Sequence, residues 1–261
     1  MRPMSCSGTK AGANRRRRSH PFFARFYRLL SKAMESGPVG RLRHDLLSEA
    51  YGRVLEIGAG TGANQPHYPP TSRLVVLSEP DAHMRGYLLK ALARSKTPRE
   101  TSPKHVVVAA TAEALPFADS CFDTVVATLT FCSLDDPQMA AAEIHRVLRP
   151  GGKLLTFEHV RSARLGVATA QRLLTPLWKR LAGNCHLDRA TEQILKEAGL
   201  ISYDSEYIHT RYVPPVLSDH LFGTFEKPSQ SSPEANRESV RRQPVTSSAA
   251  TDQDEAVRKK R

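Results

Sequence analysis

Residues 54–62 read Val54-Leu-Glu-Ile-Gly-Ala-Gly-Thr-Gly62, a short apolar strand that runs directly into a turn with three glycines. Glu56 lies near the end of the strand, and the glycines allow the backbone to pass close to a bulky ligand. Pro66 and Pro69 prevent the segment after the turn from forming a long helix. The stretch therefore predicts a ligand-binding loop at the end of the first strand of a sheet.

Short apolar segments alternate with helical patterns along the rest of the chain. The apolar segments are rich in Val, Leu and Ile, as is typical of strands buried on both faces of a parallel sheet. This alternation predicts an α/β fold, with a doubly wound sheet and helices on both faces. The predicted strands span residues 53–57, 73–77, 105–109, 124–129 and 153–157, with weaker signals near 201–208 and 220–226. The predicted helices span residues 81–93, 137–148, 168–181 and 188–198.

The 261 residues carry a net charge of +12, but this charge is concentrated at the ends of the chain. Residues 1–20 contribute +6 and residues 228–261 contribute +2, which leaves +4 for residues 21–227. Charge alone therefore does not predict a nucleic-acid-binding domain. Both end segments are polar and poor in large apolar side chains, so we expect a disordered basic tail at 1–20 and a disordered polar tail at 228–261.

Residues 21–227 are predicted to form one domain. Apolar side chains recur at helical spacing between residues 22 and 34, and Pro38 ends that pattern before a second helix begins near Leu42. Residues 21–52 are therefore expected to form a helical cover over the site.

Neither a secretion signal nor a membrane span is apparent in the sequence. No apolar run approaches the ~20 residues that a membrane-spanning helix needs. The four cysteines are scattered without the spacing of a disulfide framework, which favours a reducing compartment. We therefore expect a cytoplasmic protein.

The glycine turn is compatible with two kinds of ligand. Gly58-x-Gly60-x-x-Ala63 fits the dinucleotide fingerprint, in which a helix N-terminus binds a pyrophosphate. Glu56-x-Gly58-x-Gly60-x-Gly62 fits a bulky ligand without a phosphate. The prolines after the turn truncate the helix that a pyrophosphate needs, and this disfavours a dehydrogenase. Glu79, at the end of the next strand, can accept both ribose hydroxyls in either case.

Further motifs decide between these two kinds of ligand. They are Thr111-Ala-Glu-Ala-Leu-Pro-Phe117, Phe122-Asp-Thr-Val-Val126 and Leu148-Arg-Pro-Gly-Gly-Lys-Leu154. With these motifs, residues 54–160 resemble the class I S-adenosylmethionine-dependent methyltransferases, specifically the type 11 methyltransferase domain. The resemblance implies a seven-stranded, mostly parallel Rossmann-like sheet that ends in an antiparallel hairpin, with S-adenosyl-L-methionine as cofactor.

The resemblance also implies which residues bind the cofactor. Glycines 58, 60 and 62 would wrap its methionine portion, Glu56 would order the loop or meet the amino group, and Glu79 would bind the ribose. Residues 112 and 113 would line the adenine, and the backbone at 128 and 129 would lie near the methyl carbon. The full predicted set is Glu56, Gly58, Ala59, Gly60, Gly62, Glu79, Pro80, Ala112, Glu113, Thr128 and Leu129.

A narrower resemblance extends over residues 20–227. Segments such as Asn64-Gln-Pro-His-Tyr-Pro69, Phe157-Glu-His-Val160 and Gly183-Asn-Cys-His186 are similar to a bacterial subgroup that resembles animal thiol methyltransferase-like proteins. This implies a small-molecule methyl acceptor, possibly a thiol. Thiols ionise near pH ~8.5, so a modest shift gives a competent nucleophile.

Several side chains near the predicted carboxyl ends of the strands are candidates for the acceptor site. His159 and His186 are our acid–base candidates, and we regard Cys132 as a packed apolar residue of the pocket wall. Their spacings match no zinc-ligand framework, so no metal site is predicted. The wider set is His67, Tyr68, Phe131, Cys132, His159, Trp178, Cys185 and His186.

A function of another class stays open at this point. The chain could be a non-catalytic cofactor-binding or nucleic-acid-associated protein that is recruited through the basic run Arg15-Arg-Arg-Arg18. The folded part has no interleaved basic and aromatic surface pattern, so a nucleic-acid partner is the weaker prediction. The oligomeric state cannot be predicted from the sequence.

Overall fold

The computed structural model of the chain describes Arg25 and residues 37–95, 103–210 and 213–229. The predicted basic tail, the helix expected at 22–34 and nearly all of the polar tail lie outside these residues. The three domain boundaries therefore stay predictions.

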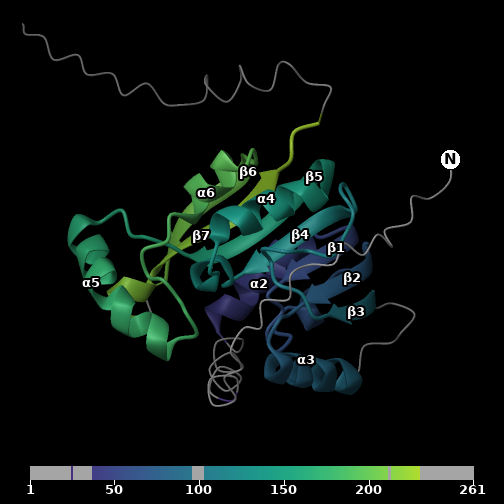
Figure 1. The fold of residues 1–261 in the computed structure, drawn as a ribbon, viewed down its shortest axis with the longest axis horizontal. Coiled ribbons are helices and arrows are strands. Elements are labelled where there is room, and N and C mark those ends of the chain that lie inside the picture. The colour runs from purple at the N-terminus through teal and green to yellow at the C-terminus, as the bar shows by residue number, and fades with distance from the viewer. Residues whose placement is uncertain (1–24, 26–36, 96–102, 211–212, 230–261) are drawn as a thin grey trace, which may run out of the picture. The chain divides into compact units, whose positions relative to one another are not determined.

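Seven strands form one mixed sheet in the order β3-β2-β1-β4-β5-β7-β6 (Figure 1). The first five strands in the chain run parallel, and β7 pairs antiparallel with both β5 and β6. This topology confirms the predicted Rossmann-like sheet with an antiparallel C-terminal hairpin. The strands are β1 (Gly52–Ile57), β2 (Ser72–Ser78), β3 (Lys104–Val108), β4 (Phe122–Thr128), β5 (Leu148–His159), β6 (Ile201–His209) and β7 (Asp219–Glu226).

Two of the helices begin at residues that cap them. The Asp81 carboxylate accepts a hydrogen bond from the Met84 backbone N–H (2.8 Å), and Asp136 does the same for Met139 (2.9 Å). The α-helices are α2 (Pro38–Ser48), α3 (Ala82–Arg94), α4 (Pro137–Val147), α5 (Leu165–Leu181) and α6 (Thr191–Glu197). Single 3₁₀ turns form η1 (Gln65–His67), η2 (Phe131–Ser133) and η3 (Pro215–Leu217). Within the described part of the chain, no helix is long and apolar enough to cross a bilayer.

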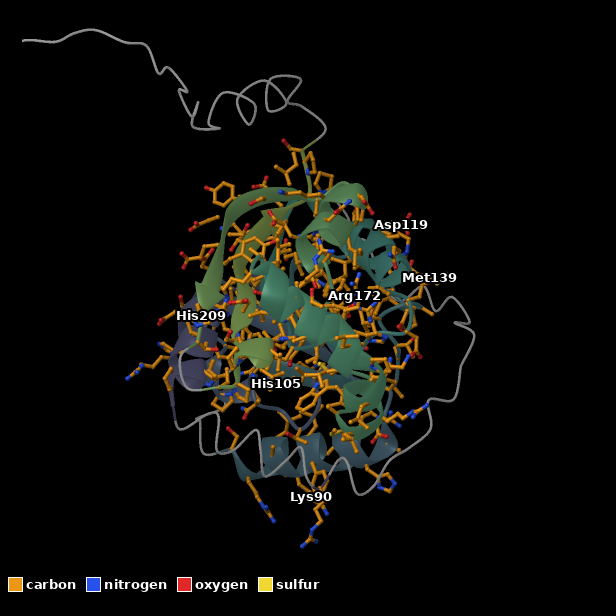
Figure 2. The ribbon with its side chains drawn as sticks, turned by 90° about the vertical axis from the view of Figure 1, so that its left-hand side faces the viewer. Lys90, His105, Asp119, Met139, Arg172 and His209 are labelled. Carbon is orange, nitrogen blue, oxygen red and sulfur yellow. The ribbon has the colours of Figure 1, made fainter. Side chains whose placement is uncertain are left out.

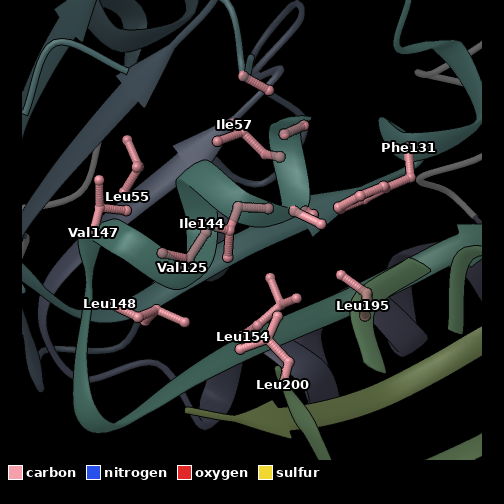
Figure 3. Close-up of a cluster of buried hydrophobic side chains, with 14 of the residues drawn as sticks. Leu55, Ile57, Val125, Phe131, Ile144, Val147, Leu148, Leu154, Leu195 and Leu200 are labelled. Atoms are coloured by element: carbon pink, nitrogen blue, oxygen red, sulfur yellow. The ribbon is translucent and has the colours of Figure 1, made fainter. Parts of the chain in front are cut away.

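Apolar side chains pack in two layers, one on each face of the sheet. On one face Ile144 of α4, Leu195 of α6 and Leu55 of β1 belong to the same cluster of buried side chains (Figure 3). On the other face Leu46 of α2 and Leu88 of α3 pack together. Helices therefore cover both faces of the sheet. The side chain of Lys90 on α3 points away from the sheet (Figure 2).

Two glycines provide a matched test of the fold. Gly223 of β7 has a φ of +136°, and a Cβ there would lie 2.1 Å from the carbonyl oxygen of Asp204 on β6. We expect Gly223→Ala to destabilise the protein by about 3 kcal/mol, because neighbouring backbone must move. Gly86 lies inside α3 with nothing within 4 Å of its Cβ position. Gly86→Ala should therefore stabilise by about 0.5–1 kcal/mol.

Urea denaturation of both variants measures these effects. Equal stability of Gly223→Ala and the wild type would contradict the close β6–β7 pairing.

Candidate functional site

The site lies where the strand order reverses, between β1 and β4. Ile57 at the end of β1 pairs with Ala127 of β4, so the residues that follow both strands emerge at the same edge of the sheet. From this edge the chain continues to β2 on one side and to β5 on the other. Open α/β sheets bind ligands at such a switch point, outside the carboxyl ends of the strands.

The glycine loop between β1 and η1 has little space for side chains. Gly58, Gly60 and Gly62 have φ values of +61°, +55° and +89°. A Cβ on Gly58 would lie 2.6 Å from the Thr130 side chain, and one on Gly62 would lie 2.9 Å from Leu88. The backbone at these positions is therefore packed against neighbouring side chains, and larger residues would displace it. The single 3₁₀ turn of η1 confirms that no long helix follows the loop.

Glu79 connects the end of β2 to the glycine loop. One carboxylate oxygen accepts the Gly60 backbone N–H (2.8 Å) and the other accepts the Asp81 backbone N–H (2.8 Å). The carbonyl oxygens of Glu79 and Pro80 both accept hydrogen bonds from the Arg85 guanidinium (2.8 and 2.6 Å), which fixes this turn. A carboxylate has about four acceptor positions and can therefore accept several donors at once.

A buried polar network lies behind the glycine loop and joins α2, β1, η1 and β4. The Arg43 guanidinium donates to the Asn64 side-chain oxygen (2.6 Å) and to the Thr128 hydroxyl (2.7 Å). The Asn64 amide donates to Glu56 Oε1 (3.0 Å) and to Thr128 (2.9 Å), and the Tyr68 hydroxyl donates to Glu56 Oε2 (2.6 Å). All five side chains are buried. The network therefore fixes the loop from its inner side.

Glu56 holds a proton more tightly than an ordinary glutamate. Burial raises its pKa to about 7, although hydrogen bonds from Tyr68 and Asn64 and the charge of Arg43 act in the opposite direction. Its side chain is only 3% exposed, so water does not screen these interactions.

The predicted adenine-binding residues lie after β3. Ala112 is buried in the core layer that contains α4. The Glu113 carboxylate accepts the Asp135 backbone N–H at 3.2 Å, which places it beside the segment that follows η2.

Glu158 holds the segment after β4 against β5. Leu129 has a positive φ of 53°, and its N–H donates to the Phe157 carbonyl (2.7 Å). The Glu158 carboxylate is fully buried and accepts the backbone N–H groups of Thr130 (2.8 Å) and Cys132 (3.5 Å). Burial raises its pKa to about 7 as well. These contacts keep the end of β4 and η2 in place at the site.

His159 and His186, the predicted acid–base residues, make different hydrogen bonds. His159 Nε2 donates to the Val216 carbonyl (2.9 Å), and its buried Nδ1 has no hydrogen-bond partner among the described residues. The His186 backbone N–H donates to the Cys132 carbonyl (2.7 Å). The Arg189 guanidinium lies 3.0 Å from His186 Nδ1, and because arginine only donates, this nitrogen is the acceptor.

The raised pKa of Glu56 predicts a pH-dependent stability. The unfolded chain ionises this carboxyl near pH ~4.5 and the folded chain near pH 7, so its contribution falls as pH rises through that window. We expect the stability difference between wild type and Glu56→Gln to fall by about 3 kcal/mol between pH 4.5 and 7.5.

Burial lowers the pKa of His220 to about 4, so the contribution of His220 to stability rises with pH, opposite to that of Glu56. His220 is present in both proteins, so the difference between wild type and Glu56→Gln reports the Glu56 carboxyl alone. Urea denaturation at several pH values measures the difference. A difference that stays constant or grows with pH would show that Glu56 is ionised throughout.

Sequence reasoning missed part of this site. Arg43 belongs to a helix that was predicted only from its leucines, and Asn64 was not singled out. Tyr68 was expected at the acceptor site, but its hydroxyl binds Glu56. Glu158 was quoted within a motif without a role. Two of these residues carry a signal in the sequence. Arg43 is an arginine in a helix with a leucine-rich apolar pattern, and Glu158 is a glutamate near the end of a buried strand.

Comparisons with known proteins agree with this geometry. A family described as a methyltransferase domain matches residues 55–156. A human protein named thiol S-methyltransferase TMT1B is 36% identical over 184 residues, which are 68% of this chain and 72% of that protein. The human thiol S-methyltransferase TMT1A is 31% identical over 190 residues, or 72% of each chain.

Solved structures share the fold at low sequence identity. The N-methyltransferase NodS of Bradyrhizobium japonicum, in complex with S-adenosyl-l-homocysteine, has a TM-score of 0.55 and 20% identity, and the match covers 76% of this chain and 91% of NodS. The [4+2]-cyclase SpnF has a TM-score of 0.61 and 18% identity, with 81% and 97% covered. SpnF shows that the fold alone does not determine the reaction. The methyltransferase-domain match and the identity to the thiol S-methyltransferases, however, establish the relationship: the chain belongs to the S-adenosylmethionine-dependent methyltransferase family.

Proposed function

We propose that this enzyme binds S-adenosylmethionine at the carboxyl ends of β1 to β4 and methylates a small-molecule thiol. The observation that carries the proposal is the pairing of the glycine loop with Glu79, through the 2.8 Å hydrogen bond from the Gly60 N–H. This pairing joins a close-packed backbone to a carboxylate at the switch point of the sheet. Such a combination suits a nucleoside whose ribose has two hydroxyl donors.

The residues present fit this cofactor. The glycines let the backbone at 58–62 adopt left-handed conformations and pack closely against Thr130 and Leu88, and this backbone would surround the methionine portion. The Glu79 carboxylate would accept the ribose hydroxyls. Ala59 and Pro80 flank these two groups, and Ala112 and Glu113 face the adenine from the next loop. Glu56 supports the loop through Asn64 and Tyr68. Thr128 and Leu129 lie beside the reacting carbon.

Bound S-adenosylmethionine supplies a methyl group on a positively charged sulfur. The chain's own contribution is to align the acceptor in line with that group and to exclude water. Leu129 is well suited to positioning, because its left-handed backbone is held by the bond to Phe157. Glu158 then fixes the segment that follows.

His159 is our candidate base for the acceptor. Its Nε2 donates to the Val216 carbonyl, so the neutral ring has its lone pair on the buried Nδ1. A thiol that enters beside Nδ1 can pass its proton to this nitrogen and become the nucleophilic thiolate. The names of the human relatives support a thiol as acceptor. His186 stays the second candidate, since Arg189 occupies its Nδ1.

A panel of small acceptors with methyl-labelled cofactor tests the acceptor class. We expect apolar thiols to be converted into methyl thioethers. Alcohols and amines of the same carbon skeleton should react at least ~100-fold more slowly, because at neutral pH an alcohol or a protonated amine gives up its proton less readily than a thiol. Mass spectrometry of the products provides the readout. Methylation confined to RNA or to protein would contradict the proposal.

A further inference from the structure

Two cysteines from distant parts of the chain meet beside His159. Cys132 belongs to η2 and Cys185 to the segment between α5 and α6. That segment is fastened to η2, because the His186 N–H donates to the Cys132 carbonyl (2.7 Å) and the Asn184 amide donates to the Ser133 carbonyl (3.0 Å). Both cysteines are free thiols; Cys132 is buried and Cys185 is half-buried.

The surroundings of the two sulfur atoms differ. Cys185 interacts with the Cys132 thiol, and His159 and Trp178 lie near it. His159 Nδ1 and Trp178 Nε1 are buried and have no hydrogen-bond partner among the described residues. The Cys132 thiol, and after it His159 and Trp178, lower the pKa of Cys185, although burial opposes them. The hydrogen bond to Cys185 and burial raise the pKa of Cys132 well above its ordinary value.

At neutral pH this difference gives the two sulfurs separate chemical roles. Cys185 is half-buried and its lowered pKa favours the thiolate, whereas Cys132 is buried and its raised pKa favours the thiol. Thiolates and not thiols attack disulfides, so Cys185 is the sulfur that reacts first with an incoming molecule. Cys132 cannot be reached directly but lies in position to react second.

We propose that Cys185 and Cys132 form a thiol–disulfide exchange site for low-molecular-weight disulfides. The Cys185 thiolate attacks one sulfur of R–S–S–R, which forms a Cys185–S–S–R bond and releases RS⁻. Cys132 then gives up its proton to that thiolate or to His159 and attacks the Cys185 sulfur. The products are a Cys132–Cys185 disulfide and a second RS⁻, so the protein is oxidised by two electrons and the small disulfide is reduced by two.

This site adds a reaction to the proposed methyl transfer and does not need it. One consequence does rest on the proposed function: if the acceptor is a thiol, its oxidised form is itself a low-molecular-weight disulfide and therefore a substrate for this exchange. The new bond would tie η2 to the α5–α6 segment beside His159. The exchange site would then respond to the redox state of the acceptor itself.

Mass spectrometry of the full-length, fully reduced chain tests the proposal, with bis(2-hydroxyethyl) disulfide as the probe at pH 7. We expect the wild type to form the Cys132–Cys185 disulfide, assigned by peptide mapping. Cys132→Ser should stop at a hydroxyethylthio adduct on Cys185. Cys185→Ser should react at least ~100-fold more slowly at this site, since less than a few per cent of an ordinary thiol is ionised at pH 7.

Cys121→Ala is the control, because Cys121 is buried in the apolar core layer and is not one of the free thiols, and this variant should form the Cys132–Cys185 disulfide at the wild-type rate. Cys185→Ala and thermal melting separate lost chemistry from misfolding. An unmodified Cys185 in folded wild type, or an adduct that Cys132 never resolves, would overturn the proposal. S-adenosylhomocysteine binding to the reduced protein is measured in parallel, so that a failure of the proposed function is recognised separately.

Discussion

Glu79→Ala is expected to weaken binding of S-adenosylhomocysteine by at least ~100-fold. Glu79 is 6% exposed, its carboxylate accepts two backbone N–H groups, and we propose that it also accepts the two ribose hydroxyls. Hydrogen bonds to a charged group contribute ~1.5–3 kcal/mol each, and two of them account for a loss of this size. Isothermal titration calorimetry with the wild type and the variant measures it directly.

Asp81→Ala is the matched control for this prediction. Asp81 lies two residues from Glu79 and caps α3 through the Met84 N–H, but it is not assigned to the ribose. We expect this variant to lose about 1 kcal/mol of stability and to keep its affinity within about threefold. Similar losses of affinity in both variants would show that the loop collapses in each case. Unchanged affinity in Glu79→Ala would contradict the role of Glu79.

His159→Gln is expected to lower kcat for a thiol acceptor by about 10²–10⁴-fold at neutral pH. This is the usual contribution of a positioned general base. The Nδ1 atom of His159 is buried and has no hydrogen-bond partner among the described residues, so it is the nitrogen that would accept the proton. The loss should shrink as pH rises past ~8.5, because the thiol then ionises without assistance. The pH profile of kcat therefore separates proton transfer from a purely structural effect.

His186→Gln serves as the comparison for His159. Arg189 already occupies its Nδ1, so we expect a loss of less than about tenfold in kcat. Affinity for S-adenosylhomocysteine should be unchanged in both histidine variants. Equal kcat in His159→Gln and wild type at pH 7, or a loss that is the same at every pH, would remove His159 from the mechanism.

Most of the fold could be predicted because its signals are local. Buried strands such as β2 and β4 are continuous apolar runs, and the capping residues Asp81 and Asp136 mark the starts of α3 and α4. The start of β5 was placed at Lys153, but the strand begins at Leu148. Its Arg-Pro-Gly-Gly segment reads as a turn, yet Leu148 pairs with Phe122 and the Gly151 N–H donates to Lys227. Such long-range pairing leaves no local pattern.

The candidate site was predictable in its glycine loop and less so in its polar interior. The glycine spacing of the loop and the acidic residue Glu79 at the end of the next strand are local patterns that can be recognised in the sequence. The contact of Arg43 with Thr128 joins residues 85 positions apart, and only the folded chain brings them together. The same holds for Cys132 and Cys185, which were both named as candidates near the acceptor without any sign that they meet.

A crystal structure of the wild type with S-adenosylhomocysteine tests the central claim most directly. The account predicts that both ribose hydroxyls donate to Glu79, that residues 58–62 surround the amino-acid portion, and that the ligand's sulfur faces the gap between Leu129 and His159. A ligand bound elsewhere, with no ribose hydroxyl on the Glu79 carboxylate, would contradict it.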